Sequence, residues 1–298
     1  MSRLRTALGG GPRLFVKRDD AIPFGFGGNK VRKLELVGAA ALAAGADTLV
    51  TLGGIQSNHA RATAAVAVRL GMQCLLIING NLPERPVANA LLDAMLGADI
   101  EYISSREERA TAAEAALARL RLAGRTPCFV PLGASTPLGA LAFVRAVGEM
   151  VEQMPAPDVI IHASSSGGTQ AGLVAGCALH GLATRVIGVS ADDPAIDIAT
   201  KINGIVAGVG ERVAAHAEFA AATAVVVDDS FVGDGYGIPT EGSREAQRLL
   251  ARSEALFVDH TYTAKALAAL IAYVRAGRFR DDETVLFWHT GGQVGLFA

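Results

Sequence analysis

Apolar residues recur along the chain in two alternating patterns. Short runs rich in Val, Ile and Leu predict buried strands at 13–17, 47–52, 73–78, 99–103, 158–162, 186–190, 224–227 and 284–288. Between most of these runs lie alanine-rich stretches with helical spacing, such as 33–44, 60–70, 106–123 and 138–154. Strands that alternate with helices in this way are typical of βαβ units. We therefore expect an α/β fold with open, twisted, mainly parallel sheets flanked by helices.

Composition narrows the function classes. The chain has 298 residues, of which 51% are hydrophobic and 19% charged, and its net charge is -2. At about 150 residues per domain this length suits two domains. A near-neutral chain lacks the cationic excess that nucleic acid or an anionic membrane surface requires, so we expect neither as a partner.

Targeting and metal signals are also missing from the sequence. No run of about 18 apolar residues occurs, and the first residues lack the apolar core of a signal peptide, so a soluble, cytoplasmic protein is expected. The six histidines are scattered without the spacing of metal ligands, and we expect no metal site.

Glycine is abundant, with 34 residues, and doublets mark loops where strands pass into helices. In open α/β sheets, ligands bind beyond the carboxyl ends of strands. The loop at 25–30 opens a helix that carries Lys30 and Lys33, which share one helix face because they are three positions apart. The GxxxxGK[ST] spacing of a P-loop is absent, which argues against a P-loop NTPase.

Two further loops offer seats for anions. Ser57 in the loop 53–59 is a good N-cap, and capping alone explains it, but a helix start also attracts a carboxylate. The loop 164–170 has Ser, Gly and Thr side by side, the chemistry of a phosphate nest, without the GxGxxG spacing of a dinucleotide site. Together with the polar strand end at 289–292, these loops suit a phosphorylated cofactor that forms a Schiff base with lysine.

The ordered set of motifs resembles the D-cysteine desulfhydrase and aminocyclopropane-carboxylate deaminase family. The match rests on KRDD from Lys17, GGNKVRKLE from Gly27, GGIQSNHAR from Gly53, SSSGGTQAGL from Ser164, GYG from Gly235, YTAK from Tyr262 and HTGG from His289. The resemblance implies pyridoxal 5'-phosphate, a tryptophan-synthase-β-like fold and a homodimer. It also implies a large cofactor-binding domain, expected at 1–36 and 137–298, and a small domain at 37–136, with the active site between them.

The resemblance also assigns roles at the cofactor. Lys30 corresponds to the Schiff-base lysine that moves the α-proton, and Lys33 to a phosphate ligand whose charge would lower the pKa of Lys30. The reverse assignment of the two lysines stays open as the alternative. Asn58 corresponds to the residue at the ring hydroxyl. The remaining cofactor contacts are the phosphate cup and two threonines: Ser165, Ser166, Gly167, Gly168, Thr169, Thr263 and Thr290.

At the substrate, Ser57 corresponds to the carboxylate seat, together with the N–H groups of Asn58 and His59. Tyr236 and Tyr262 correspond to two tyrosines that face the substrate. Ser57 and both tyrosines are therefore expected to be catalytic, with Lys30.

Two positions bear on the reaction. Deaminases of the family carry glutamate after the second tyrosine and leucine before the final glycine pair, whereas Thr263 and Thr290 stand here. A neutral hydroxyl leaves the cofactor ring a weaker electron sink, which suits elimination of a good leaving group. We therefore expect α,β-elimination from D-cysteine to pyruvate, hydrogen sulfide and ammonia. The alternatives are an L-cysteate sulfo-lyase, an aminocyclopropane-carboxylate deaminase and a cofactor-binding protein without turnover.

Overall fold

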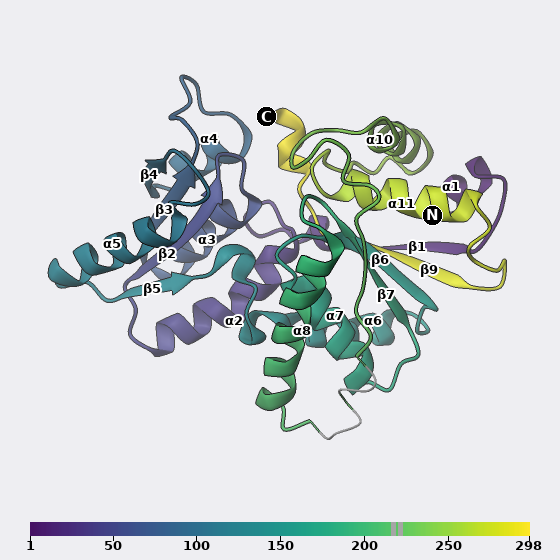
Figure 1. Ribbon diagram of the computed structural model, residues 1–298, viewed down its shortest axis with the longest axis horizontal. Coiled ribbons are helices and arrows are strands. Elements are labelled where there is room, and N and C mark those ends of the chain that lie inside the picture. The colour runs from purple at the N-terminus through teal and green to yellow at the C-terminus, as the bar shows by residue number, and fades with distance from the viewer. Residues whose placement is uncertain (216–218, 220–222) are drawn as a thin grey trace.

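The protein folds into two parallel β-sheets that lie side by side, with helices on the faces of each (Figure 1). The computed structural model describes residues 1–215, 219 and 223–298. One sheet has the strand order β1-β9-β6-β7-β8, with β1 (Arg13–Arg18), β6 (Val159–Ser164), β7 (Arg185–Ser190), β8 (Val226–Asp228) and β9 (Thr284–His289). The other has the order β4-β3-β2-β5, with β2 (Thr48–Gly54), β3 (Gln73–Asn79), β4 (Asp99–Ile103) and β5 (Pro127–Val130). Every recorded pairing is parallel, which confirms the predicted fold class.

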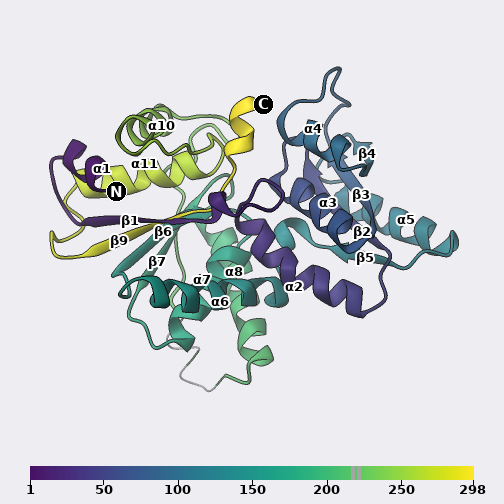
Figure 2. The same ribbon diagram turned by 180° about the vertical axis from the view of Figure 1, so that it is seen from behind.

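The five-stranded sheet is buried on both faces, which explains why its central strands are continuously apolar. Along β9, Val285 and Phe287 pack toward one helical layer, while Leu286 and Trp288 pack toward the other. The first layer consists of α1 (Ser2–Ala7), α10 (Glu241–Glu254) and α11 (Thr263–Arg275). The second consists of α6 (Pro137–Gln153), α7 (Gly168–Leu179) and α8 (Ala195–Arg212), and Figure 2 shows both layers from behind.

The four-stranded sheet is covered in the same way. On one face α2 (Asn29–Ala43) and α3 (Asn58–Leu70) pack against Leu49 and Leu76. On the other face α5 (Arg109–Leu122) packs against Val50 and Ile77. Helix α4 (Ala88–Met95) rests on α3, and the short helix η3 (Gln293–Phe297) at the carboxyl end contacts α4. The end of the chain therefore reaches back to the four-stranded sheet.

The predicted strands all occur, with bounds shifted by one or two residues. Strand β5 was missed because it is a short edge strand that begins with proline. The helix predicted at 33–44 begins earlier, at Asn29, because its first turn carries polar side chains that hide the apolar period. That first turn holds Lys30, so the correction matters for the site.

Helix α2 connects the two halves of the molecule. It starts beside the five-stranded sheet, packs along α6, and runs on against the four-stranded sheet (Figure 1). The expected domain boundary after residue 36 falls inside this helix, and the boundary at 137 coincides with the start of α6. Both boundaries stay predictions.

Across the part of the chain that the structure describes, no helix has the length and apolar character needed to cross a membrane.

Candidate active site

A cavity of about 460 Å³ lies where the carboxyl ends of strands from both sheets meet. Gly53 and Asn79 reach it from β2 and β3, whereas Ser164 and Thr290 reach it from β6 and from the turn after β9. This is the edge at which ligands bind in open α/β sheets. The predicted residues that line it are Lys30, Ser57, Asn58, His59, Ser165, Ser166, Gly167, Thr169, Tyr236, Tyr262 and Thr290.

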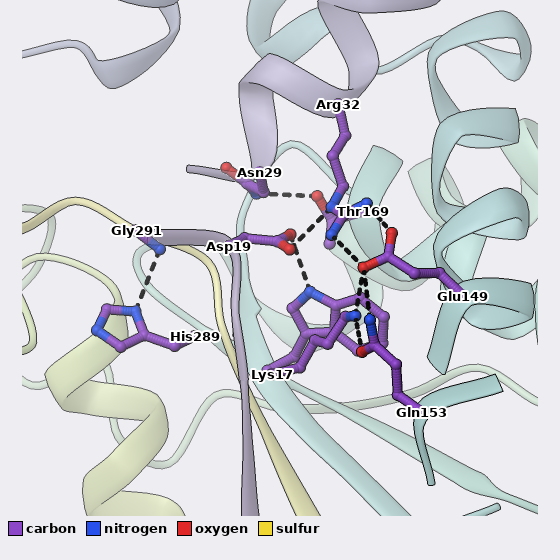
Figure 3. A network of polar contacts seen from close by, with 10 residues as sticks. Lys17, Asp19, Asn29, Arg32, Glu149, Gln153, Thr169, His289 and Gly291 are labelled. Atoms are coloured by element: carbon purple, nitrogen blue, oxygen red, sulfur yellow. Dashed lines mark hydrogen bonds and ion pairs between the residues drawn. The ribbon is translucent and has the colours of Figure 1, made fainter. Parts of the chain in front are cut away.

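The start of α2 presents Lys30 to this cavity. Gly27 precedes the helix at a φ of +65°, and a Cβ there would lie 2.6 Å from the carbonyl oxygen of Asp20, so only glycine fits the turn. The Nδ2 of Asn29 donates to Oγ1 of Thr169 at 2.9 Å, which ties the helix start to the serine-glycine loop (Figure 3). Lys30 Nζ donates to Oδ1 of Asn29 at 3.0 Å. The lysine is thus held at the cavity wall.

A network of charges beneath the cavity anchors the same helix (Figure 3). Asp19 is fully buried, and its two oxygens accept from Arg32 Nε at 2.8 Å and from Trp288 Nε1 at 2.9 Å. Arg32 also pairs with Glu149 of α6 at 2.8 Å. Glu149 in turn accepts from Lys17 of β1. The network therefore joins α2 and α6 to β1 and β9, an edge strand of the first sheet and its neighbour.

The two lysines differ in their surroundings. Lys30 lines the cavity, and burial together with the charge of Arg61 lowers its pKa to about 8. Lys33 is 1% exposed behind the wall and donates to Ser135 Oγ at 3.4 Å. Burial, and then the charge of Lys30, hold the pKa of Lys33 well below its usual range. Lys33 was predicted to lower the pKa of Lys30, but in the structure the cation that does so is Arg61.

The serine-glycine loop lines the same cavity as Lys30. It turns at Gly167, where φ is +82°, and then enters α7, whose first N–H groups have no acceptor inside the helix. The hydroxyl of Ser164 is buried without a partner among the described residues. Ser135 Oγ lies 2.8 Å from Ser166 Oγ and accepts from the N–H of Gly168 at 3.2 Å. These donors, with Lys33 behind them, suit a phosphate group.

The start of α3 forms another wall. Ser57 Oγ accepts from the N–H of Ala60 at 3.1 Å, so capping is its observed role in the structure. Asn58 Oδ1 accepts from Asn89 Nδ2 at 3.0 Å. The ring of His59 contacts Thr51 Oγ1 at 2.8 Å, and burial beside the two lysines holds the pKa of His59 well below its usual range. The partial positive charge at the start of α3 favours a carboxylate at this wall, and the neutral His59 adds no charge of its own.

The two tyrosines meet at another part of the cavity wall. The hydroxyls of Tyr236 and Tyr262 are 2.5 Å apart, and the ring centroids are separated by 5.7 Å. Burial raises the pKa of both phenols, so both are protonated at neutral pH. The Arg106 guanidinium lies over the Tyr236 ring, 5.0 Å from its centroid. Arg106 follows β4 of the other sheet, so this contact closes one edge of the cavity.

Three predicted cofactor residues stand behind the wall instead of lining it: Lys33, Gly168 and Thr263. Thr263 is fully buried, and its hydroxyl donates to Asp259 Oδ1 at 2.7 Å. Thr290 does line the cavity, and its carbonyl accepts from the N–H of Asn29 at 2.9 Å.

Charged and polar residues outside the motifs also reach the cavity and were missed. Asp192 and Asp193 follow β7, and they pair with Arg106 at 3.9 Å and with Lys201 at 2.7 Å. Arg109 donates through Nε to Asn79 Oδ1 at 3.0 Å. The only sequence signal for these six was their place at the end of a strand, just after one or in the next helix. Ser135 lies in the 133–139 stretch, which stood out only for its glycines and proline.

A lysine and a phosphate nest that line one cavity between two parallel sheets are arranged as in pyridoxal-phosphate enzymes of fold type II. The family model for pyridoxal-phosphate dependent enzymes matches residues 1–291, and the chain belongs to this family. The predicted cofactor, pyridoxal 5'-phosphate, is thereby confirmed. The residues present also fit this cofactor. The Ser164 hydroxyl, which has no partner among the described residues, and the first N–H groups of α7 can donate to a phosphate, and the lowered pKa of Lys30 suits an amine that forms a Schiff base.

Solved structures agree with this classification. The crystal structure of an ACC deaminase homologue is 31% identical and superposes with a TM-score of 0.91, covering 100% of this chain and 89% of its own. The processed form of threonine deaminase isoform 2 from Solanum lycopersicum is 16% identical, with a TM-score of 0.68 and coverages of 98% and 77%. A pyridoxal 5'-phosphate-dependent aspartate racemase is 15% identical, with a TM-score of 0.70 and coverages of 97% and 87%. The last two comparisons support the fold alone.

Proposed function

We propose that the protein is a lyase that eliminates the β-substituent of a small amino acid, with D-cysteine as its substrate. One water is consumed, and pyruvate, hydrogen sulfide and ammonia are released. The observation that carries this proposal is the hydroxyl chemistry of the wall beside Tyr262. Thr290 lines the cavity where the resembled deaminases have leucine, and Thr263 replaces their glutamate. From the family resemblance we also propose a cytoplasmic homodimer.

The nearby carboxylate does not substitute for that glutamate. Asp259 is 2% exposed, and its two oxygens accept the N–H groups of Thr261, Tyr262 and Thr263 and the hydroxyl of Thr263. A carboxylate with four donors of its own is satisfied locally and is not available to a ring nitrogen. The wall beside Tyr262 therefore offers the ring nitrogen no free carboxylate, which suits a substrate whose leaving group departs readily.

Lys30 has the properties of the residue that holds the cofactor and then moves a proton at Cα of the amino acid. Bound pyridoxal phosphate supplies an electron sink for the carbon next to the amino group. With a pKa of about 8, Lys30 is a neutral base in an appreciable fraction of molecules at neutral pH. Lys33, Ser166 and Thr169 would hold the phosphate.

The start of α3 would orient the substrate carboxylate, because the N–H groups of Asn58 and His59 belong to its first turn. The paired hydroxyls of Tyr236 and Tyr262 also line the cavity and remain protonated, so they can donate to a departing anion. Carboxylate on one side and leaving group on the other would hold the Cα proton near Lys30.

A panel of substrates tests the proposal. The holoenzyme is expected to form pyruvate and sulfide from D-cysteine faster than it forms products from L-cysteate, β-chloro-D-alanine or aminocyclopropane carboxylate. Turnover of aminocyclopropane carboxylate alone would instead show that the protein is a deaminase, the activity after which its 31% identical relative is named. Bound cofactor without any turnover would refute the lyase proposal.

A second candidate is an L-cysteate sulfo-lyase, and one observation favours it. Sulfite as the leaving group calls for an extra cation beside the substrate, and Arg109 is such a cation. Its contact at the wall is the amide oxygen of Asn79, and no carboxylate pairs with it among the described residues. Arg106 and Lys201, by contrast, have Asp192 and Asp193 as partners.

The substitution Arg109→Gln separates the two candidates. If sulfite is the leaving group, the variant should lose about 100-fold in kcat/KM for L-cysteate, in line with loss of a buried charge pair. Turnover of D-cysteine should fall much less. Arg119→Gln, on the exposed side of the same helix and paired with Glu101, serves as the control and should leave both unchanged.

A further inference from the structure

Lys265 is a buried lysine that the reaction does not use. It lies in the first turn of α11, is 0% exposed and is not part of the cavity wall. Its ammonium donates to three backbone carbonyls, those of Ala191 at 3.1 Å, Val232 at 2.7 Å and Gly235 at 2.8 Å. Three carbonyl oxygens can only accept hydrogen bonds, so they need three donors, and a lysine has three N–H bonds only in its charged ammonium form.

The charges near Lys265 are consistent with this arrangement. Burial lowers its pKa, while the carboxylates of Asp192 and Asp259 act in the opposite direction. The three carbonyls come from two separate segments, the end of β7 and the loop that follows β8. Hard oxygen ligands that converge from separate segments are also the ligands that a monovalent cation such as K⁺ takes.

Two of the three carbonyl contacts of Lys265, and Lys265 itself, lie close in sequence to residues of the cavity wall. Ala191 immediately precedes Asp192, Gly235 immediately precedes Tyr236, and Tyr262 is one turn before Lys265 itself. The loop that carries Tyr236 is otherwise exposed, and its backbone has few partners of its own. The ammonium is therefore the common anchor of the wall that brings the two tyrosine hydroxyls together.

We propose that Lys265 is a positioning residue that serves as a built-in monovalent cation. The carbonyls of Ala191, Val232 and Gly235 form a cation site, and the lysine side chain fills it permanently. By filling it, Lys265 holds Tyr236 against Tyr262. The wild-type protein therefore has no requirement for K⁺, and removal of the side chain creates one.

Two substitutions distinguish this role from ordinary packing. Lys265→Ala removes the stem and the charge, which leaves the oxygen site open to an ion. Lys265→Met keeps the stem and fills the space with an apolar group, which leaves the carbonyls unpaired with no room for an ion. Met150→Ala removes a fully buried side chain from α6, away from any such site, and serves as the control.

The measurement is the melting temperature of the full-length holoenzyme in potassium chloride and in tetramethylammonium chloride at equal ionic strength. Lys265→Ala should melt about 5 °C lower than wild type in the bulky cation and recover in potassium. Lys265→Met and Met150→Ala should melt lower in both salts alike, and wild type should not respond. Melting requires no substrate, so the result does not depend on the proposed reaction.

Turnover supplies the second readout. In tetramethylammonium chloride Lys265→Ala should lose about 100-fold in kcat with retained cofactor, because the tyrosine wall is misplaced, and K⁺ should restore most of it. An equal response of Lys265→Ala and Lys265→Met to K⁺ would overturn the proposal. So would a Lys265→Ala protein that is insensitive to K⁺ or does not fold in potassium chloride, because an open oxygen site would then not take the ion.

Discussion

At the scale of single residues, the site depends on two lysines that sequence alone could not separate fully. Lys30 and Lys33 lie on one helix face, and the interval between them was equally compatible with either as the reactive amine. The structure places Lys30 at the cavity wall and Lys33 behind it, beside Ser135. How far each lysine lies from the cavity depends on how α2 packs, and the sequence alone does not give that distance.

Substitution of each lysine by alanine is expected to give different defects. Lys30→Ala should abolish the absorbance of the lysine-linked cofactor, because the other amine at the cavity wall, that of Lys201, is paired with Asp193. Lys33→Ala should keep that absorbance but bind pyridoxal phosphate more weakly, by about 10- to 100-fold, because a charge behind the phosphate is lost. Spectra and equilibrium titration with the cofactor distinguish them. The opposite pattern would make Lys33 the reactive amine.

The pH dependence of cofactor uptake checks the same assignment. Because the pKa of Lys30 is lowered to about 8, the neutral amine decreases about tenfold for each pH unit below that value. The rate at which cofactor-free protein takes up pyridoxal phosphate should therefore rise with pH and level off near pH 8. A rate that still rises steeply above pH 9 would show an amine with an ordinary pKa.

Most motif residues could be placed from the sequence because glycine turns and helix starts are local features. The missed residues have no such local mark. Ser135 acts through contacts with Lys33 and Ser166, and Arg109 acts through its place at the wall. Both depend on which loops meet in space, and only the assembled fold determines that.

At the scale of elements, hydrophobic periodicity was sufficient for every strand except β5, and α4 was not among the helices singled out. This helix has only eight residues, and buried polar side chains attach it to α3. Asn89 bonds with Asn58 and with Arg61 Nε, which lies 2.9 Å from Asn89 Oδ1. Arg61 in turn donates to the carbonyl of Gly27, in the turn before Lys30. The spacing of apolar residues does not predict a contact between helices that is made by buried polar side chains.

The buried carboxylate of this joint makes α4 sensitive to pH. Burial raises the pKa of Asp93 to about 7, although the charge of Arg61 opposes the shift. A carboxyl group whose pKa is raised on folding contributes most stability when protonated, and that stability is lost as pH rises from about 4 to about 7. The ionised Asp93 therefore lowers the stability of the folded state at pH 8.

Asp93→Asn is accordingly expected to stabilise the protein at pH 8. Three pKa units correspond to about 4 kcal/mol, which sets the upper bound of the gain. At pH 4 the same substitution should change the free energy of unfolding by less than about 1 kcal/mol, because the native carboxyl is then protonated. Urea unfolding at both pH values measures the difference. A loss of stability at pH 8 would mean that Asp93 and Arg61 form a net favourable pair.

At the scale of the whole molecule, α2 is the element that joins cofactor, cavity and both sheets. The two-sheet architecture could be expected from the alternation of strands and helices, and the family resemblance indicated a cleft between two domains. The charge network that seats α2 was not foreseen, because its members are far apart in sequence: Lys17, Asp19, Arg32, Glu149 and Trp288 (Figure 3).

The centre of this network is Asp19, which is fully buried and whose pKa is raised by burial despite the cation beside it. Arg32 is that cation, and it also lowers the pKa of Glu149 to about 2 by hydrogen bonding. Replacing Arg32 with Met would leave Asp19 charged and without a cation partner other than the more distant Lys17. Such a loss is typically worth about 3 to 5 kcal/mol.

Arg32→Met is therefore expected to lower the free energy of unfolding by about that amount and to weaken binding of pyridoxal phosphate, since Lys30 and Lys33 lie on the same helix. In the double variant Asp19→Asn/Arg32→Met neither charge of the pair remains, so a large part of the stability should return. The defect of the single variant should also shrink as pH falls, because protonated Asp19 needs no cation. Urea unfolding and cofactor titration of the wild type, both single variants and the double variant, a double-mutant cycle, measure these effects. Additive losses in the cycle would mean that Arg32 seats the helix by packing and not by its charge.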